Sequence, residues 1–241
     1  MIDSVPHWYH RIELAPGVVT PGINDTAQAL TRFDLPADCA GLRVLDLGTR
    51  DGFYAFEMER RGADVVAVDY MPMESMGFKV LKDHFGSKVR FVQENVENLS
   101  PEALGTFDIV LFLGLLYHMR NPLRALDVVR SLCRDRMYLS THLVDNAFRV
   151  EGGKFVTLAS FSPELLEHPI MQFWPKDAYG NAWNGYWGPN SKCVEMMLEE
   201  ANFTVLNKEV AGARGFFTCR TNDDPVIAYH HKISSGAALP E

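Results

Sequence analysis

The stretch Arg43-Val44-Leu45-Asp46-Leu47-Gly48-Thr49-Arg50-Asp51-Gly52 carries the clearest structural signal in the sequence. Its first half is mostly apolar and predicts a buried strand, and a glycine-rich turn follows directly. A helical pattern then continues to Arg61. We expect Phe53 and Phe56 of this helix to face the sheet. The stretch therefore predicts a strand–turn–helix unit.

The same alternation of apolar runs and helical patterns continues to about Ala201. Further strands are predicted over 64–69, 89–93, 107–113 and 136–141, and helices over 75–85, 121–133 and 190–201. Two final strands, over 203–210 and 216–220, form a predicted hairpin-like pair. Strands that alternate with helices are typical of βαβ units. The sequence thus predicts an α/β, Rossmann-like fold with a mostly parallel sheet flanked by helices.

The chain divides into four predicted segments. Residues 1–40 precede the first strand, and we expect them to form an N-terminal cap on the active edge of the sheet. Residues 41–233 form the α/β domain. Within it, residues 145–189 lack periodicity and are rich in glycine, proline and aromatic residues. Loops this long inside a compact domain are usually functional, so we expect a substrate-side insertion after strand five. Residues 234–241 are expected to be a flexible tail.

The turn after the first strand has the features of a ligand site. Glycine lets the backbone approach a ligand, and ligands of open α/β sheets bind at the carboxyl ends of the strands. Nicotinamide folds favour G-x-G-x-x-G, whose middle glycine makes room for pyrophosphate. Here Gly48 and Gly52 are separated by three other residues, and Asp46 and Asp51 would disfavour a pyrophosphate. A cationic sulfonium with an amino acid tail suits this acidic turn, so S-adenosylmethionine is favoured over nicotinamide and flavin.

Polar residues after the next two strands extend the predicted cofactor site. Asp69 ends the second strand, where a carboxylate can accept hydrogen bonds from ribose hydroxyls. Asn95 and Val96 follow the third strand, where an amide side chain and a backbone N–H can hold adenine; a polar turn is the alternative there. The predicted cofactor-binding residues are Asp46, Gly48, Thr49, Arg50, Gly52, Asp69, Tyr70, Asn95, Val96 and Leu113.

Composition excludes several other classes of protein. The 241 residues carry a net charge of −8, and an acidic chain repels phosphate backbones, which weakens a nucleic-acid function. No apolar run approaches the roughly 20 residues of a membrane helix, and the first ten residues lack a secretory pattern. A cytoplasmic protein without membrane contact is therefore expected. The four cysteines form no C-x-x-C pair, and no metal site is predicted.

Longer motifs resemble a known family. VLDLGTRDGFYAF followed by VVAVD resembles the class I methyltransferase pattern, and FDIVLFLGLLYHMRNPLRAL is a narrower signal. With WYHRIEL and VTPG near the start, these motifs resemble the family that contains the enzyme carboxymethylating the wobble uridine of transfer RNA. The resemblance covers roughly residues 8–210. It implies a seven-stranded α/β fold and transfer of a methyl or substituted methyl group.

The resemblance also implies roles for particular residues. Tyr117 and His118 fall on the family's Tyr-His pair. In carboxymethyl-transferring members, that tyrosine, an upstream lysine and a late arginine hold the extra carboxylate of carboxy-S-adenosylmethionine. No lysine precedes Arg43 in this sequence, which favours plain S-adenosylmethionine. The arginines in the corresponding regions are Arg11 and Arg32 early in the chain and Arg214 and Arg220 late in it.

Methyl transfer needs positioning of the nucleophile and, for some acceptors, a base. His118 is the first candidate base, His142 the second and His10 the third; hydrogen bonding to a loop backbone is the alternative for each. The predicted catalytic residues are His118, His142 and Tyr117. Aromatic residues of the insertion form either a lid over a planar substrate or a small core. The predicted substrate-binding residues are Trp8, Tyr9, His10, Arg11, Trp174, Trp183, Tyr186 and Trp187.

Three functions are compatible with these features. The first is an S-adenosylmethionine-dependent methyltransferase that acts on an oxygen or nitrogen atom of a small molecule. The second is a tRNA-modifying enzyme that uses carboxy-S-adenosylmethionine. The third is a non-catalytic module that binds S-adenosylmethionine. The oligomeric state stays open, with a homodimer as one option.

Overall fold

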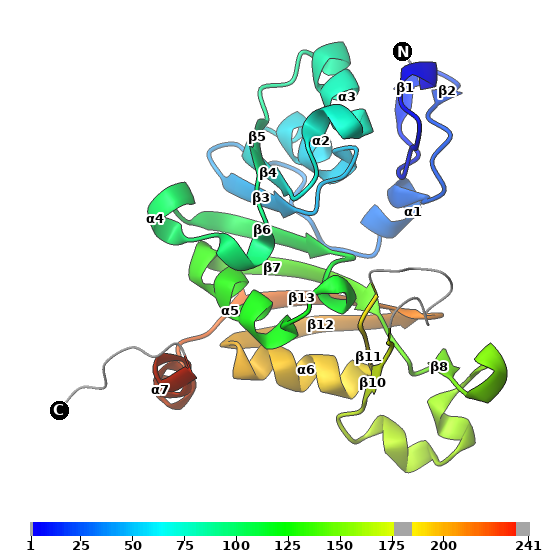
Figure 1. Cartoon of the computed structure of the whole chain (residues 1–241). Helices are drawn as coiled ribbons and strands as arrows, with labels where there is room; N and C mark the ends of the chain where they lie inside the picture. Colours follow the sequence, from blue (N-terminus) through cyan, green and yellow to red (C-terminus); the bar gives the residue numbers. More distant parts are fainter. Residues whose placement is uncertain (1, 176–184, 235–241) are drawn as a thin grey trace.

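A seven-stranded sheet organises the computed structural model, which describes residues 2–175 and 185–234 (Figure 1). Its strand order is β12-β13-β7-β6-β3-β4-β5. Five neighbouring strands, β7, β6, β3, β4 and β5, run parallel. The β12–β13 hairpin adds two antiparallel strands beside β7, at the edge of the sheet. The strands are β3 (Arg43–Leu47), β4 (Asp64–Asp69), β5 (Arg90–Gln93), β6 (Phe107–Leu113), β7 (Cys133–His142), β12 (Phe203–Ala211) and β13 (Arg214–Thr221). The predicted mostly parallel sheet is confirmed.

The order of the strands reverses at β3. From β3 the chain adds β4 and β5 on one side and then β6 and β7 on the other. In open α/β sheets such a reversal leaves a crevice beyond the carboxyl ends of the strands, and ligands bind there. The strand itself is buried on both faces, with Val44 and Leu45 fully enclosed, as expected for a parallel strand between two helix layers.

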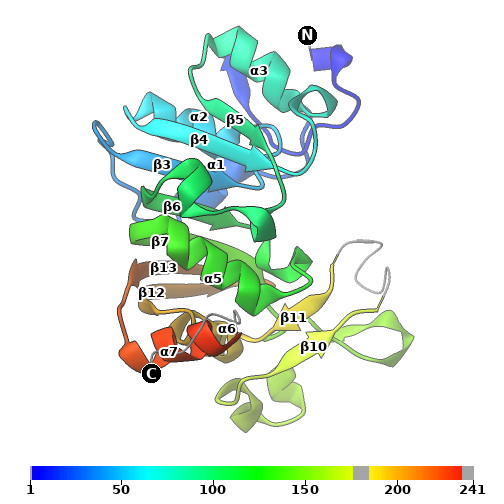
Figure 2. The same cartoon turned by 60° about the vertical axis from the view of Figure 1, so that its left-hand side comes forward.

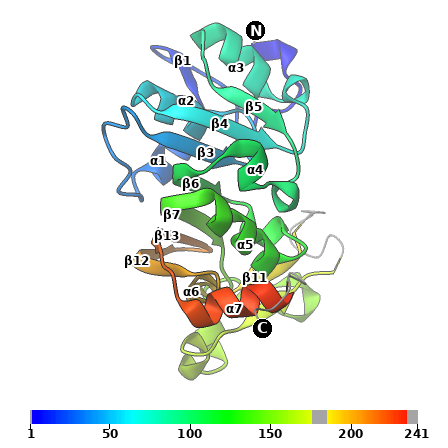
Figure 3. The same cartoon turned by 90° about the vertical axis from the view of Figure 1, so that its left-hand side faces the viewer.

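Helices cover both faces of the sheet. Val44 packs in a cluster with residues of α2 and α3, whereas Leu45 packs in a second cluster with residues of α5 and α6. Figure 3 shows α1 and α5 on opposite sides of the sheet. The α-helices are α1 (Thr26–Leu30), α2 (Phe53–Arg60), α3 (Gly77–Phe85), α4 (Pro101–Leu104), α5 (Pro122–Leu132), α6 (Ser191–Glu200) and α7 (Pro225–Ser234). Short 3-10 turns are η1 (Ile2–Ser4), η2 (Met73–Ser75), η3 (Val96–Asn98), η4 (Leu116–His118), η5 (Glu151–Gly153), η6 (Leu158–Ser160) and η7 (Pro163–Leu166).

The predicted orientation of α2 is wrong for Phe53, whereas Phe56 does pack against the cluster that contains the sheet residues. Ala55 and Met58 are fully buried against the sheet, whereas Phe53 and Phe56 are half-buried. Both phenylalanines also contact the cluster formed by the N-terminal cap and α3. The helix starts at Phe53, so the i, i+3 row that meets the sheet begins two residues later. The large aromatic rings therefore fill the space between α2 and the cap.

The cap and the insertion both lie on the side to which the parallel strands point (Figures 1 and 2). The cap contains a small hairpin, β1 (Glu13–Ala15) with β2 (Val18–Val19), and it packs on Leu81 of α3. The insertion is built from two further small hairpins, β8 (Phe148–Arg149) with β9 (Phe155–Val156) and β10 (Met171–Phe173) with β11 (Trp187–Pro189). Two segments far apart in the sequence thus flank the crevice.

Three helices, α1, α4 and α7, had no counterpart in the sequence prediction. α4 is only one turn long. α7 lies near the end of the predicted domain, in a stretch for which no secondary structure was predicted. α7 lies beside α6, where His230 Nδ1 is 3.5 Å from Glu200 Oε1. Ser234, predicted as the first residue of the tail, is the last residue of α7. Residues 235–241 lie outside the described residues.

We expect the core around β6 to carry much of the stability. Leu111 is fully buried, and replacing it with alanine should cost about 2–5 kcal/mol of unfolding free energy through lost burial and a cavity. Leu123 of α5 is 47% exposed and provides the matched control, for which Leu123→Ala should cost less than about 0.5 kcal/mol. Urea unfolding of both variants measures the two costs. Equal losses would contradict this assignment of the core.

Candidate functional site

The turn between β3 and α2 is held in a fixed conformation by β4. Backbone N–H groups of Gly48 and Thr49 donate to Val68 O at 2.8 and 3.1 Å, and that of Arg50 donates to Asp69 Oδ2 at 3.0 Å. Gly48 has a φ of 71°, and a Cβ there would lie 2.6 Å from the Leu115 side chain. The turn therefore requires glycine at this position.

Arg50 occupies the middle of the turn with a φ of 50°. Non-glycine residues adopt this left-handed conformation at a cost of order 1 kcal/mol or more, so the surrounding contacts must hold it. Its guanidinium lies over the Tyr9 ring at 5.5 Å, and Nη1 donates to Met71 Sδ at 3.1 Å. The side chain thereby links the turn to the cap.

Two buried carboxylates lie at the carboxyl ends of β3 and β4. Burial raises the pKa of Asp46 to about 7, and the neighbouring charge of Asp69 adds to the rise. Burial also raises the pKa of Asp69, although its oxygens accept hydrogen bonds from the backbone N–H groups of Met71 and Arg50. Asp46 therefore ionises far more readily when a cation lies beside it.

Asp46 Oδ2 and Thr49 Oγ1 are buried and have no hydrogen-bond partner among the described residues. Thr49 lies close enough to Asp46 to oppose the rise in its pKa, but the two oxygens do not meet hydrogen-bond geometry, so both remain able to pair with a ligand. An acidic, partly neutral turn fits a ligand that is cationic and can donate hydrogen bonds. The residues present thus fit S-adenosylmethionine.

The other predicted cofactor residues lie at or just beyond the carboxyl ends of β4, β5 and β6. Tyr70 follows Asp69 and is 56% exposed, and its carbonyl accepts a hydrogen bond from Gln93 Nε2 at 3.3 Å. Asn95 Oδ1 accepts the backbone N–H of Glu97 at 3.0 Å, so this amide side chain also shapes its own turn. Val96 is buried in the core, and Leu113 is half-buried. Their cofactor contacts stay predictions.

A second group of predicted residues meets beyond β6 and β7. The ring of Tyr117 lies 3.9 Å from that of His118 and 6.3 Å from that of His142, measured between centroids. The His142 ring lies 5.1 Å from that of Trp174. Three predicted site residues on η4, β7 and the insertion, namely Tyr117, His142 and Trp174, are thus brought together by the fold.

Burial and the positive charge of Arg214 lower the pKa of His142 to about 4. At neutral pH this imidazole is uncharged and a weak base. Burial raises the pKa of Tyr117, and Arg214 opposes the rise. His118 is half-buried, whereas His142 is buried, so His118 is the more accessible of these two candidate bases.

Among the four arginines considered from the sequence, Arg214 is the one that contacts Tyr117. Its Nη2 donates to Tyr117 Oη at 3.4 Å, and its guanidinium lies 5.3 Å from the centre of the Tyr117 ring. Arg220, at the other end of β13, lies 3.4 Å from Asp135, and Arg32 pairs with Glu209. Arg11 is exposed. Of the two late arginines, Arg214 is therefore the one that contacts Tyr117.

The insertion is tied to η4 by backbone hydrogen bonds. Tyr186 N–H donates to Tyr117 O at 2.9 Å, and Trp174 N–H donates to Tyr186 O at 2.8 Å. Trp174 is almost completely buried, whereas Trp187 is half-buried and donates through Nε1 to Arg120 O at 3.4 Å. Trp174 is thus a buried residue that packs beside His142. Trp183 lies outside the described residues.

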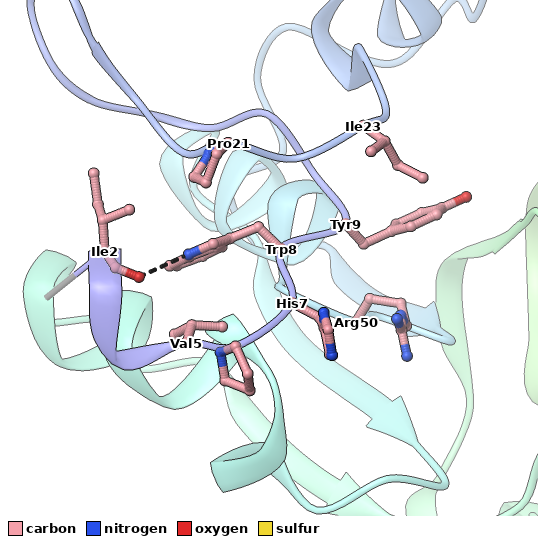
Figure 4. A pocket seen from close by; sticks show the side chains of 9 residues that line it. Ile2, Val5, His7, Trp8, Tyr9, Pro21, Ile23 and Arg50 are labelled. Atoms are coloured by element: carbon pink, nitrogen blue, oxygen red, sulfur yellow. Dashed lines mark hydrogen bonds between the residues drawn. The ribbon is translucent and has the colours of Figure 1, made fainter.

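The cap forms a pocket of about 470 Å³ against the turn between β3 and α2, residues 48–52, which we call the cofactor turn (Figure 4). Trp8 and Tyr9, two predicted substrate-binding residues, line it together with Arg50 of the turn. Trp8 is 8% exposed, and its Nε1 donates to Ile2 O at 3.0 Å. Trp8 is therefore mainly a wall of the cap, whereas Tyr9 and Arg50 face one another across its edge.

Sequence reasoning missed two residues of this region. Tyr54 of α2 lies close enough to Asp46 and Arg214 for their charges to act on it. Burial raises the pKa of Tyr54 well above that of an exposed tyrosine. Asp51 is buried and accepts hydrogen bonds from three backbone N–H groups. Neither role has a local sequence signal, because both depend on contacts with distant segments. No cluster of potential metal ligands occurs among the described residues.

Comparisons with known proteins agree with this geometry. A family model described as a methyltransferase domain matches residues 23–208. The chain is 29% identical over 170 residues to the tRNA U34 carboxymethyltransferase of Shewanella pealeana, covering 69% of this chain and 45% of that protein. It is 38% identical over 99 residues to magnesium-protoporphyrin O-methyltransferase of Rhodobacter capsulatus, covering 41% and 43%. The chain thus spans a little under half the length of these relatives.

Solved structures share the fold. The Burkholderia thailandensis 1,6-didemethyltoxoflavin-N1-methyltransferase with S-adenosylhomocysteine has a TM-score of 0.54 at 24% identity, covering 76% of this chain and 72% of that one. Magnesium protoporphyrin IX methyltransferase from Synechocystis PCC 6803 with bound S-adenosylmethionine has a TM-score of 0.51 at 16% identity, covering 81% and 76%. None of the helices in the described part of the chain has the length and apolarity required to cross a bilayer.

The raised pKa of Asp46 predicts how stability changes with pH. An unfolded aspartate has a pKa of about 3.9, so between about pH 4 and 7 the folded carboxyl keeps a proton that the unfolded chain releases. The unfolding free energy should therefore fall as pH rises through this window, by an amount on the order of 4 kcal/mol. Above about pH 7 the effect should level off.

The variant Asp46→Asn removes this ionisable group, whereas carboxylates away from the turn titrate equally in both proteins. Urea unfolding without cofactor, from about pH 5 to about pH 8, should show the variant gaining stability relative to the wild type as pH rises. A difference that stays constant with pH would mean that Asp46 ionises normally in the fold.

Proposed function

The chain belongs to the methyltransferase domain family, and we propose that it transfers the methyl group of S-adenosylmethionine to an oxygen or nitrogen atom of a small molecule. The observation that carries the proposal is the buried acidic turn, in which Asp46 Oδ2 and Thr49 Oγ1 have no partner among the described residues. The net charge of −8 and the aromatic walls of the neighbouring crevice favour a small acceptor over a polyanion.

The cofactor residues divide the work of binding. Asp69 offers carboxylate oxygens to ribose hydroxyls at the end of β4, and Asp46 offers one to a cationic or hydrogen-bond-donating group beside the turn. Gly48 keeps the backbone free of a side chain at this point. S-adenosylmethionine supplies a methyl group on a sulfonium, which is already a good leaving group. The chain's remaining task is to orient the acceptor.

Acceptor binding is assigned to the group around Tyr117. His142 is neutral at physiological pH, so it positions an acceptor by hydrogen bonding and does not carry charge. Where the acceptor must lose a proton, His118 is the proposed base, because it is less deeply buried and its ring contacts that of Tyr117. Trp174 and Tyr186 shield this side from water.

One observation favours a second candidate, transfer of a carboxymethyl group to transfer RNA. The Tyr117–Arg214 contact at 3.4 Å pairs the two residue types that hold the extra carboxylate of the carboxylated cofactor in the resembling family. The lysine that completes that arrangement has no counterpart before Arg43. Plain S-adenosylmethionine is therefore the first choice and its carboxylated form the second.

Mass spectrometry of the nucleoside that copurifies with the protein separates these candidates. S-adenosylmethionine or S-adenosylhomocysteine supports methyl transfer and directs acceptor screening to small molecules. Carboxy-S-adenosylmethionine, together with salt-sensitive binding to transfer RNA, would replace the first candidate with the second. Binding of S-adenosylmethionine without turnover of any acceptor would favour a non-catalytic module.

Asp69→Ala should weaken S-adenosylmethionine binding at least about tenfold, because losing a buried charged acceptor costs more than about 1.4 kcal/mol. Asp64→Ala provides the matched control, since Asp64 begins the same strand and is exposed at its opposite end. Isothermal titration calorimetry measures both affinities. A similar affinity in the two variants would remove Asp69 from the proposed cofactor site.

A further inference from the structure

The backbone of His10 in the cap is held from both sides. Its backbone N–H donates to Asp51 Oδ2 at 2.9 Å, and its carbonyl accepts the Thr20 hydroxyl at 2.6 Å. Thr20 Oγ1 in turn accepts the backbone N–H of Ile12 at 2.9 Å. At Gly22 a Cβ would lie 2.2 Å from the His10 carbonyl, so the chain closes directly around this residue. The backbone of His10 therefore has little freedom to move.

Asp51 connects this arrangement to the cofactor turn. One carboxylate oxygen accepts the N–H groups of Tyr9 and His10 at 2.7 and 2.9 Å, and the other accepts that of Gly77 at 3.0 Å. Asp51 is 1% exposed and precedes Gly52 at the end of the turn. A single buried carboxylate thus joins the turn to the cap and to the start of α3.

The His10 imidazole has an open hydrogen-bonding position. The residue is only 4% exposed, and Nδ1 has no partner among the described residues. The ring centroid lies 4.9 Å from that of Tyr9 and 6.2 Å from those of Phe53 and Tyr54. An unpaired buried polar atom costs about 1–3 kcal/mol unless a ligand or water completes it. A rigidly held imidazole with such an atom points to a bound group.

The groups facing His10 keep it uncharged. Burial lowers its pKa to about 4, Asp51 opposes the change, and Arg50 lowers it further. Tyr9 and Tyr54 are the other titratable groups packed on the ring, and Tyr54 lies within reach of the charge on Asp46. His10 therefore places a neutral polar ring beside an acidic turn.

We propose that His10 is a cofactor-site residue whose neutral imidazole faces the cationic sulfonium of bound S-adenosylmethionine, with Asp51 and Thr20 as its positioning residues. This role rests on the proposed function, because it presupposes that S-adenosylmethionine binds at the turn. A positive charge at position 10 would repel a sulfonium, whereas a neutral ring polarises toward it. S-adenosylhomocysteine carries an uncharged sulfur, so the same change leaves its binding free of that repulsion.

A pair of variants of similar length and different charge tests the proposal. His10→Lys introduces an ammonium, and His10→Met introduces a neutral chain of comparable size. The affinities for S-adenosylmethionine and S-adenosylhomocysteine are measured by calorimetry at about pH 6, where a buried lysine keeps more of its proton. We expect the ratio of the two affinities to fall at least about tenfold in His10→Lys relative to His10→Met.

Damage to the fold lowers both affinities and leaves their ratio unchanged, so an equal ratio in the two variants overturns the proposal. If His10→Lys does not fold, the ring nitrogens of His10 in the wild type are followed by 15N NMR. S-adenosylmethionine and S-adenosylhomocysteine should then shift them by different amounts, and identical shifts overturn the proposal. A wild type that binds neither compound would instead remove the proposed function.

The positioning role of Asp51 has a separate readout. Asp51→Asn should speed hydrogen exchange of the Tyr9 and His10 amides at least about tenfold and reduce the selectivity for S-adenosylmethionine. Asp108→Asn is the matched control, because Asp108 also accepts a backbone N–H, that of Arg43 at 2.9 Å, at the opposite end of the sheet. Unchanged exchange in Asp51→Asn, or equal effects of both variants, would show that Asp51 does not position His10.

Discussion

The burial of carboxylates at the carboxyl ends of β3 and β4 is the constraint around which the site is organised. Removing a charge from water is costly unless other groups replace the lost solvation. Asp69 and Asp51 are compensated by backbone N–H groups, which fix the turn, the cap and the start of α3 relative to one another. Asp46 retains an oxygen without a partner among the described residues, and its pKa rises to about 7. The turn is thus rigid in its backbone and still able to interact with a cation.

The acceptor side follows a different principle. Its residues come from η4, from the end of β7, from the insertion and from the start of β13, and the edge hairpin brings the last of these into place. In the register of β13 on β7, Arg214 is opposite His142. One arginine therefore acts on the electrostatics of both His142 and Tyr117. This shared charge links His142 and Tyr117, the two buried residues of the proposed acceptor side.

The cap is tied to the turn between β3 and α2. It is anchored through Asp51 to the cofactor turn, and its Tyr9 ring lies under the Arg50 guanidinium. Arg50 adopts a left-handed backbone, and its side chain contacts both Tyr9 of the cap and Met71 after β4. The cofactor turn and the wall beside it are therefore one connected unit, which is the arrangement that pre-organised binding requires.

The sequence by itself determined the parallel sheet, the turn at 48–52 and the acidic residues after β3 and β4, because apolar periodicity and glycine spacing are local properties. It also identified Tyr117 and His142, although it could not show that their rings meet. The roles of Asp51, Tyr54 and Arg214 were decided only by the tertiary structure. Each depends on a contact with a segment tens of residues away, and no local pattern encodes which distant backbone N–H or ring a side chain will reach. The position of Phe53 also depends on tertiary structure, because its ring packs against the cluster of the cap and α3.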